Sequence, residues 1–325
     1  MGTKAMAFNR VNPDRWKADI AQSVDMYNNW FIHFAPEAYR NTREQTTRDV
    51  EDTLRKTRNL TDVGESLLRD NPRILPTLRM ATCPPLARDR LIGLAGVPPN
   101  LVEKMEKDQR LPPRMPRHEV DRGLGKMAVV FQTMADKDIL VWLERGDEPS
   151  EKEIYRAATV IADRLCGAIA NPIIRNAQEK RQLAAIASWL EDQGYARVPV
   201  GVQRSVDKMD PGTFSFRMNV SAEQEGAGRR VNIPVDAVIM PKAAGPGDLP
   251  LLVEAKSAGD YTNVNKRRKE EAAKVGQLRQ SYGKDVEFIL FLCGYFDSGY
   301  LGYEAAEGID WVWEHRIEDF QEFGL

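Results

Sequence analysis

The sequence contains few of the residues that form disulfides or bind soft metals. It has three cysteines and three histidines in 325 residues, and all six are widely separated. A disulfide framework needs paired cysteines, and a structural zinc site needs closely spaced cysteine and histidine ligands. The sequence therefore excludes both as organising features and indicates a reducing compartment.

Long apolar runs are also absent. No stretch approaches the roughly 18 uninterrupted apolar residues of a membrane-spanning helix, and residues 1–7 lack the apolar core of a signal peptide. Hydrophobic residues make up 42% of the chain and charged residues 29%, as in ordinary globular proteins. We therefore expect a soluble, cytoplasmic protein that has no membrane partner.

The chain has no excess of positive charge, since its formal net charge is −2. The total charge thus gives no sign of a nucleic-acid partner. A neutral protein can still bind DNA when its basic residues gather on one face. The positions of the basic clusters therefore matter more than their sum.

The distribution of apolar residues divides the chain in two. Residues 1–148 show mostly helical periodicity, in segments such as 16–34 and 41–58, and the polar segment 144–153 separates them from the rest. We therefore expect a helical region over residues 1–148 and a second domain over residues 149–325.

Two short helices are expected inside the first region, at residues 84–92 and 98–105, around a glycine-containing turn. This pattern fits a helix-turn-helix, whose second helix can enter a DNA major groove. An ordinary helical hairpin fits the same lengths and spacing. If the motif binds DNA, Asn100 and Lys104 on the second helix are candidate contacts.

The second region predicts an αβββαβ core with a mixed central sheet, in the α/β (α+β) class. Its predicted elements are a helix at 175–193, strands at 213–220, 231–240 and 249–257, a helix at 263–282 and a strand at 286–295. The last strand is a nearly continuous apolar run, which is typical of a strand covered on both faces.

Three charged residues interrupt two of these apolar strands: Asp236 in one, and Glu254 and Lys256 in the next. Side chains alternate along a strand, so Glu254 and Lys256 project from the same face. Buried charges are costly unless a partner compensates them. Mg²⁺ held by Asp236 and Glu254 is one such partner, with Lys256 placed to orient or deprotonate an attacking water. A buried ion pair without catalytic function is the alternative.

Other polar residues of this domain are weaker candidates. Glu179 lies on the apolar stripe of the first helix and is either an auxiliary carboxylate or a salt-bridging residue. The basic run that includes Lys266, Arg267 and Arg268 begins the second helix, where it either contacts phosphate or forms a solvated face. Gln277 is a further candidate for a hydrogen bond near the site.

The order of these residues resembles the PD-(D/E)xK nuclease superfamily, with Asp236, Glu254 and Lys256 on consecutive strands and Glu179 on the preceding helix. The usual Pro-Asp is here one residue longer, Pro234-Val235-Asp236. Residues 78–97 (LRMATCPPLARDRLIGLAGV) and 173–182 (IIRNAQEKRQ) are similar to the XamI family of type II restriction endonucleases. This similarity extends over nearly the whole chain.

The resemblance implies a type II restriction endonuclease that cleaves double-stranded DNA at a short palindromic site. It also implies Mg²⁺ dependence, action as a homodimer and a cognate DNA methyltransferase as functional partner. Residues 1–148 would then supply DNA recognition or dimer contacts. The alternatives are a repair nuclease that acts on DNA structure, and a DNA-binding protein whose second domain is catalytically silent.

Overall fold

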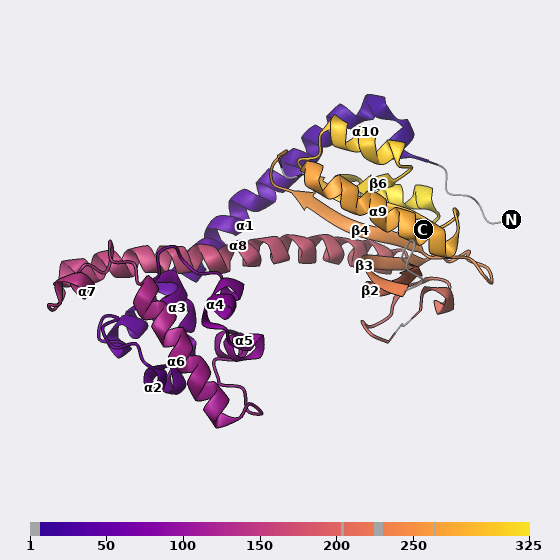
Figure 1. Ribbon diagram of the computed structural model, residues 1–325. Helices are drawn as coiled ribbons and strands as arrows, with labels where there is room; N and C mark the ends of the chain where they lie inside the picture. Colours follow the sequence, from indigo (N-terminus) through magenta and orange to yellow (C-terminus); the bar gives the residue numbers. More distant parts are fainter. Residues whose placement is uncertain (1–6, 203–204, 224–229, 263) are drawn as a thin grey trace. The chain divides into compact units, whose positions relative to one another are not determined.

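The computed structural model describes residues 7–202, 205–223, 230–262 and 264–325, without the side chains of residues 207 and 264–268. The chain forms two compact units (Figure 1). One, here called the α/β unit, contains Arg175–Leu325 and the described residues up to Phe34. The other, the helical unit, is Ala35–Ile174. The sequence pattern placed a single boundary near residue 148, whereas both changes of unit fall within long helices.

Those helices are α1 (Pro13–Lys56) and α8 (Glu151–Asp192), and each contains an internal proline. The sequence analysis predicted separate helical segments at 16–34 and 41–58 in place of α1 and a helix that begins at 175 in place of α8, and these bounds are wrong. A proline inside a helix costs about 3 kcal/mol. In α8, Leu165 before the proline and Ile186 and Leu190 after it are buried, and each such side chain contributes about 1.5–3 kcal/mol. Burial on both sides of Pro172 therefore outweighs its cost.

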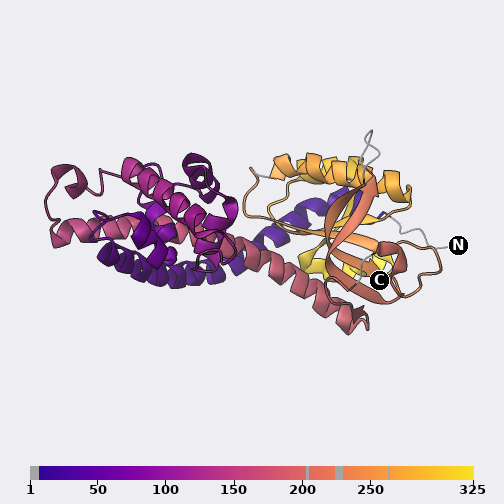
Figure 2. The ribbon, with the colours of Figure 1, turned by 60° about the horizontal axis from the view of Figure 1, so that its bottom comes forward.

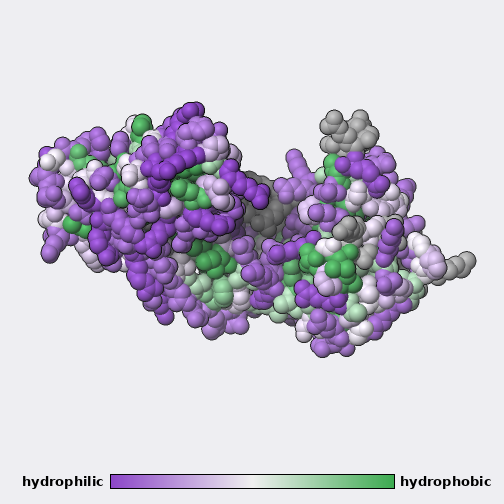
Figure 3. All heavy atoms as spheres, turned by 90° about the horizontal axis from the view of Figure 1, so that it is seen from below, coloured by the Kyte–Doolittle hydropathy of each residue, from purple (hydrophilic) through white to green (hydrophobic). Residues whose placement is uncertain are grey.

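Among the described residues, α8 is also the helix whose length and apolar content match a membrane span, with a mean hydropathy of 1.3 over its best window. Part of its apolar surface is buried inside the protein, however. Ala157 and Ile161 are buried in the core of the helical unit, and Ile186 and Leu190 in that of the α/β unit. Figure 3 shows mainly hydrophilic residues over the visible face of the helical unit.

A six-stranded mixed sheet organises the α/β unit, with strand order β1-β2-β3-β4-β5-β6 (Figures 1 and 2). Its strands are β1 (Ala196–Arg197), β2 (Thr213–Glu223), β3 (Arg230–Met240), β4 (Leu251–Ala258), β5 (Phe288–Gly294) and β6 (Asp310–Trp313). β2, β3 and β4 are antiparallel neighbours, whereas β1 is parallel to β2, and β4, β5 and β6 are parallel. The structure confirms the predicted mixed sheet and adds β1 and β6.

Helices cover both faces of this sheet. Leu183, Ile186 and Leu190 of α8 pack against one face, together with Val253 of β4. On the other face, Val275 and Leu278 of α9 pack with apolar residues of β3, β4 and β5. The remaining elements of the unit are α9 (Val264–Tyr282), α10 (Ser298–Ala306) and the 3-10 helices η1 (Asn9–Val11), η3 (Val206–Lys208) and η4 (Glu314–Phe323). The observed architecture is therefore the expected α/β sandwich.

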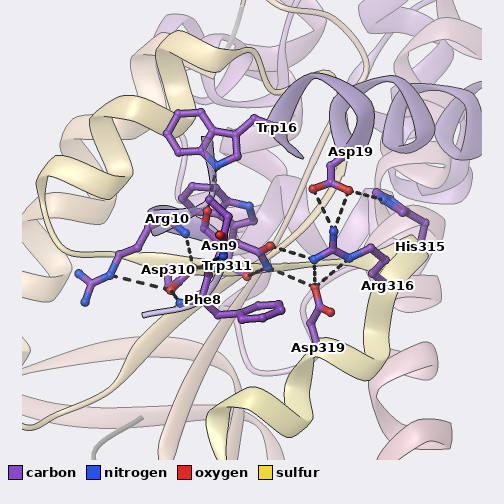
Figure 4. Close-up of polar contacts among 11 residues, drawn as sticks. Phe8, Asn9, Arg10, Trp16, Asp19, Asp310, Trp311, His315, Arg316 and Asp319 are labelled. Carbon is purple, nitrogen blue, oxygen red and sulfur yellow. Dashed lines mark hydrogen bonds and ion pairs between the residues drawn. The ribbon is translucent and has the colours of Figure 1, made fainter. Parts of the chain in front are cut away.

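The first described residues of the chain are fixed to this unit by buried charges (Figure 4). Asp310, at the start of β6, accepts hydrogen bonds from the backbone N–H groups of Phe8, Asn9 and Arg10 at 2.6–3.1 Å. Arg316 joins Asp19 at 2.9 Å and also contacts Asn9. Sequence-distant ends of the unit are thus held together by polar contacts as well as by packing.

The helical unit has an apolar core of its own. It contains parts of α1 and α8 together with α2 (Glu65–Asp70), η2 (Pro72–Ile74), α3 (Leu75–Met80), α4 (Arg88–Ala95), α5 (Pro99–Lys107), α6 (Arg117–Met134) and α7 (Trp142–Arg145). Gly96, with φ +57°, ends α4 in the left-handed conformation that glycine adopts readily. Gly123 of α6 lies so close to Leu101 that an added Cβ would come within 2.6 Å of its Cδ2. The short α4–α5 pair therefore packs tightly against α6.

Candidate active site

The site begins where β3 and β4 separate. Their ladder ends at the pair Ala237–Val253. Beyond this pair β3 stays with β2, and β4 stays with β5, where Glu254 pairs with Leu290. At the fork, Oδ2 of Asp236 accepts a hydrogen bond from the backbone N–H of Ala255 at 2.9 Å. The Asp236 carboxylate thus accepts the backbone N–H group of Ala255, which lies beyond the end of the β3–β4 ladder.

Glu254 and Lys256 face α9. Their neighbours Val253 and Ala255 contact the core on the α8 side of the sheet, so alternation turns the two charged side chains to the other side. Their side chains are only 8% and 16% exposed, respectively. Lys256 Nζ lies 3.0 Å from Glu254 Oε1. The residues that the sequence placed on one strand face are therefore in direct contact.

Helix α9 contributes two further charged residues that the sequence analysis missed. Glu271 Oε1 lies 3.0 Å from Lys256 Nζ, and Lys274 Nζ lies 2.7 Å from Glu254 Oε1. The four residues form a chain of alternating charge, Glu271–Lys256–Glu254–Lys274, which is neutral as a whole. Their spacing carried a signal, because Glu271 and Lys274 share a helix face with the buried Val275 and Leu278.

The carboxylates of this four-residue network keep the Lys256 side chain charged. Burial alone lowers the pKa of its ammonium group, but the charges of Glu254 and Glu271 and their hydrogen bonds outweigh burial and raise that pKa. Lys256 is therefore a protonated donor in this arrangement. Of the two roles considered from the sequence, orienting a water molecule fits this state better than deprotonating it.

Asp236 is less well compensated. Burial and the nearby charge of Glu254 raise the pKa of its carboxyl group to about 6, against the opposing effects of the Ala255 N–H and Lys256. Glu254 has a related deficit, because both lysines contact its Oε1 while its buried Oε2 has no hydrogen-bond partner within the described structure. The raised pKa of Asp236 and the unpaired Oε2 of Glu254 together indicate a position for a cation among the described residues.

The donor set suits a hard divalent cation with few protein ligands. Among the described residues, no group of three or more His, Cys, Asp or Glu side chains is placed to hold a metal. Mg²⁺ commonly binds through one or two carboxylates and completes its shell with water and phosphate oxygens. Asp236 and the free oxygen of Glu254 fit that requirement.

Glu179 lies near the site but has its own partner. Its carboxylate is 2.7 Å from Arg217 of β2, both side chains are substantially exposed, and its charge contributes to the raised pKa of Asp236. Arg217 has φ +51°, a conformation that is rare for a residue with a side chain. Such local strain is concentrated at functional sites. No pattern in the sequence indicated Arg217.

Gln182 of α8 donates hydrogen bonds to the backbones of β4 and β5 next to the candidate site. It is buried, and its Nε2 donates to the backbone oxygens of Lys256 and Phe291, both at 3.2 Å. One side chain therefore ties β4 to β5 beside the catalytic candidates. For Gln277, the structure records only a hydrogen bond to its backbone oxygen, from Ser281.

The candidate DNA contacts lie in two places. Lys266, Arg267 and Arg268 belong to the first turns of α9, but their side chains lie outside the described residues. Asn100 is exposed in the first turn of α5. Lys104, one turn later, has its Nζ 2.7 Å from Asp108, so its charge is already compensated.

Two comparisons with known proteins match most of the chain. Residues 58–313 match the XamI restriction endonuclease family. The type II restriction enzyme SalI of Streptomyces albus G is 51% identical over 318 residues, which are 97% of this chain and 99% of that enzyme. The crystal structure of protein VC1899 from Vibrio cholerae aligns with 89% of this chain and 55% of its own, at 11% identity and a TM-score of 0.28.

A TM-score that low defines no common fold, so the assignment depends on the family match and on SalI. Both extend over most of the chain, and they favour a restriction enzyme over the repair nuclease and the silent DNA-binding protein. The chain belongs to the XamI family of type II restriction endonucleases and is a site-specific deoxyribonuclease.

Proposed function

We propose that this enzyme hydrolyses phosphodiester bonds of double-stranded DNA at Asp236, Glu254 and Lys256, with Mg²⁺ held by the two carboxylates. The observation that carries the proposal is the buried Glu254 Oε2, which has no hydrogen-bond partner among the described side chains, beside an aspartate whose pKa is raised to about 6. When bound, the ion supplies positive charge that stabilises the charge developing on the phosphate.

The protein's own residues then have separate roles. Asp236 and Glu254 provide the negative charge that draws the cation to the fork of β3 and β4. Lys256, a protonated donor, orients the attacking water and offsets negative charge as the bond to phosphorus forms. Glu179 acts as an auxiliary carboxylate through its charge on Asp236, while Arg217 compensates it.

Site recognition is proposed for the helical unit. Asn100 is exposed at the start of α5, the second helix of the α4–α5 pair, which is the position from which a recognition helix reads bases. Lys104 would have to exchange Asp108 for a phosphate. Lys266, Arg267 and Arg268 are proposed phosphate contacts on the basis of their sequence alone.

A two-fold homodimer follows from the proposed palindromic site, since each copy would read one half-site. A cognate methyltransferase would protect the host DNA in the same cytoplasm. Light scattering of the protein with and without a cognate duplex tests the dimer, and a monomer in both conditions contradicts it.

The decisive experiment is digestion of a sequenced plasmid by the purified enzyme with Mg²⁺, with Ca²⁺ or with EDTA. We expect discrete fragments with Mg²⁺ only, and sequencing of the ends gives the site and the cut position. A parallel digest with SalI shows whether the two enzymes share a site. Cleavage that persists in EDTA, or in Asp236→Asn, contradicts the proposed metal site.

A further inference from the structure

We infer that Glu271 is a positioning residue that holds the Lys256 ammonium group at the catalytic position. The inference rests on the proposed function, because it assigns Glu271 a role only through Lys256. Lys256 Nζ is 3.0 Å from Glu271 Oε1 and 3.0 Å from Glu254 Oε1, so the amine is held between one carboxylate on α9 and one on β4.

The burial of Glu271 is the first reason for this inference. Its side chain is 1% exposed and lies on the same helix face as the buried apolar residues Val275 and Leu278. A carboxylate in such a position is costly unless a cation compensates it. Among the side chains that the structure describes, Lys256 is the cation within ion-pair distance of Glu271. The Glu271 carboxylate is therefore placed to hold the Lys256 ammonium group by an ion pair.

The second reason is the competition for Glu254. Lys256 and Lys274 both contact its Oε1, and the proposed cation would also draw on this carboxylate. If Glu254 were the only counter-ion of Lys256, the ammonium group would be drawn toward Glu254. Binding of the metal to Glu254 would then leave the positive charge of the lysine without a compensating carboxylate. Glu271 provides a second carboxylate that the metal does not need. Lys256 can then stay in place throughout the reaction.

A purely structural ion pair would have different consequences. Replacement of a buried ionic network by apolar residues is often neutral or stabilising, so the network is weak evidence for stability. The position of a catalytic group, in contrast, is demanding, since a displacement of about 1 Å can cost on the order of 10²-fold in rate. Glu271→Gln removes one partner but leaves Lys256 paired with Glu254, so a positioning role should lower turnover beyond any loss of stability.

The test compares Glu271→Gln, which keeps the shape and removes the charge, with the matched control Glu270→Gln on the exposed neighbouring residue. Cleavage of a cognate duplex in Mg²⁺ gives kcat and KM, and titration in Ca²⁺ gives the Kd for DNA without turnover. For Glu271→Gln we expect kcat to fall about 10²-fold, with KM and Kd within about threefold of wild type. Glu270→Gln should match wild type.

Two further variants make the result specific. In a Lys256→Met background, Glu271→Gln should change the residual rate by less than about threefold, because a residue that acts through Lys256 has no effect once the lysine is gone. Glu271→Asp keeps the charge but shortens its reach, so kcat should lie between those of wild type and Glu271→Gln. If Glu271→Gln does not fold, the Asp variant carries the same comparison.

Several outcomes overturn the inference. These are a wild-type kcat for Glu271→Gln (or for Glu271→Asp, if only that variant folds), independent effects of the two substitutions, or a parallel loss of turnover and Ca²⁺-supported binding. Normal cleavage by Lys256→Met would instead overturn the proposed function. An inactive Lys256→Met beside a fully active Glu271→Gln overturns the inference alone.

Discussion

Each unit contains an aspartate that is removed from water, and the two are treated differently. In the helical unit, Asp136 is 3% exposed and its Oδ2 lies 2.8 Å from the guanidinium group of Arg164, which also donates to the backbone oxygen of Met80. In the α/β unit, no ion pair with Asp236 is found among the described residues, and its pKa is raised to about 6. The charge of Asp136 is thus compensated by an ion pair, whereas that of Asp236 is not within the described structure.

A third aspartate shows that burial alone does not make the difference. Asp310 is 5% exposed, yet its carboxylate accepts four backbone N–H groups, from Phe8, Asn9, Arg10 and Trp311. Asp236 accepts one, from Ala255. Burial raises the pKa of both carboxyl groups, and the two differ in the number of groups that compensate their charge. Each prediction below changes one side of this comparison.

The largest effect is expected at Lys256. Lys256→Met should reduce cleavage by about 10²- to 10⁴-fold, the usual contribution of a group that assists proton transfer or stabilises charge. DNA binding in Ca²⁺ should change far less. Cleavage rates and Ca²⁺-supported affinities, both measured well below the unfolding midpoint, give the result. Near-normal turnover would reduce Lys256 to a structural ion-pair partner.

The next effect concerns the helical unit. Arg164→Met leaves the Asp136 carboxylate buried without its cation, and breaking a buried pair in this way costs about 3–5 kcal/mol. Denaturant unfolding at neutral pH measures the loss. The exposed pair Arg43–Asp163 on the same unit is the control, because Arg43→Met should cost no more than about 1 kcal/mol. Equal losses at the two positions would show that Asp136 does not depend on its arginine.

Asp236→Asn should act in the opposite direction on stability. The folded state raises the pKa of this carboxyl group, so its ionisation opposes folding above about pH 6, and this penalty disappears as the pH falls toward the ordinary value. Removal of the charge should therefore stabilise the metal-free protein by up to about 3 kcal/mol near pH 8, and by little near pH 4. Cleavage should fall to background.

Unfolding of both proteins in EDTA over this pH range tests the prediction. Asp310→Asn is the matched control. Burial raises the pKa of that carboxyl group as well, but the amide cannot accept all the hydrogen bonds that the carboxylate takes from four backbone N–H groups, so the substitution should lower stability. A loss of stability at Asp236→Asn of similar size would place Asp236 with the structural carboxylates, and the ion-pair interpretation of the site would then be the better one.

The sequence predicted the part of the site that depends on local periodicity. Alternation along a strand placed Glu254 and Lys256 on one face, and the αβββαβ order brought Asp236 beside them. Glu271 and Lys274 were missed because their contacts depend on how α9 packs on the sheet, which local periodicity does not predict. Arg217 was missed because its positive φ is imposed by tertiary structure.

Local sequence rules also did not predict that α1 and α8 are continuous helices. Pro36 and Pro172 are helix-breaking signals in the sequence, and both lie inside unbroken helices. The burial that outweighs them involves residues far away in the chain, which no window around the proline contains. For the same reason the boundary at 148 was drawn from a local change in polarity, while the units divide where long-range packing changes.

The smallest effect is expected at Glu179, where the sequence left two interpretations open. Its carboxylate pairs with Arg217 and acts on Asp236 through its charge, which raises the pKa of that carboxyl group. Glu179→Gln should therefore lower the pKa of Asp236 slightly. The acid limb of the cleavage rate should move to lower pH by less than about one unit, with a plateau rate within roughly tenfold of wild type.

Rate–pH profiles in Mg²⁺ measure both quantities, and Arg217→Gln should move the limb the other way, because it leaves the charge of Glu179 uncompensated. A metal ligand would behave differently, since its loss would lower the plateau by orders of magnitude at every pH. That result would make Glu179 a third member of the metal site and would remove it from the surface ion pairs that the structure shows.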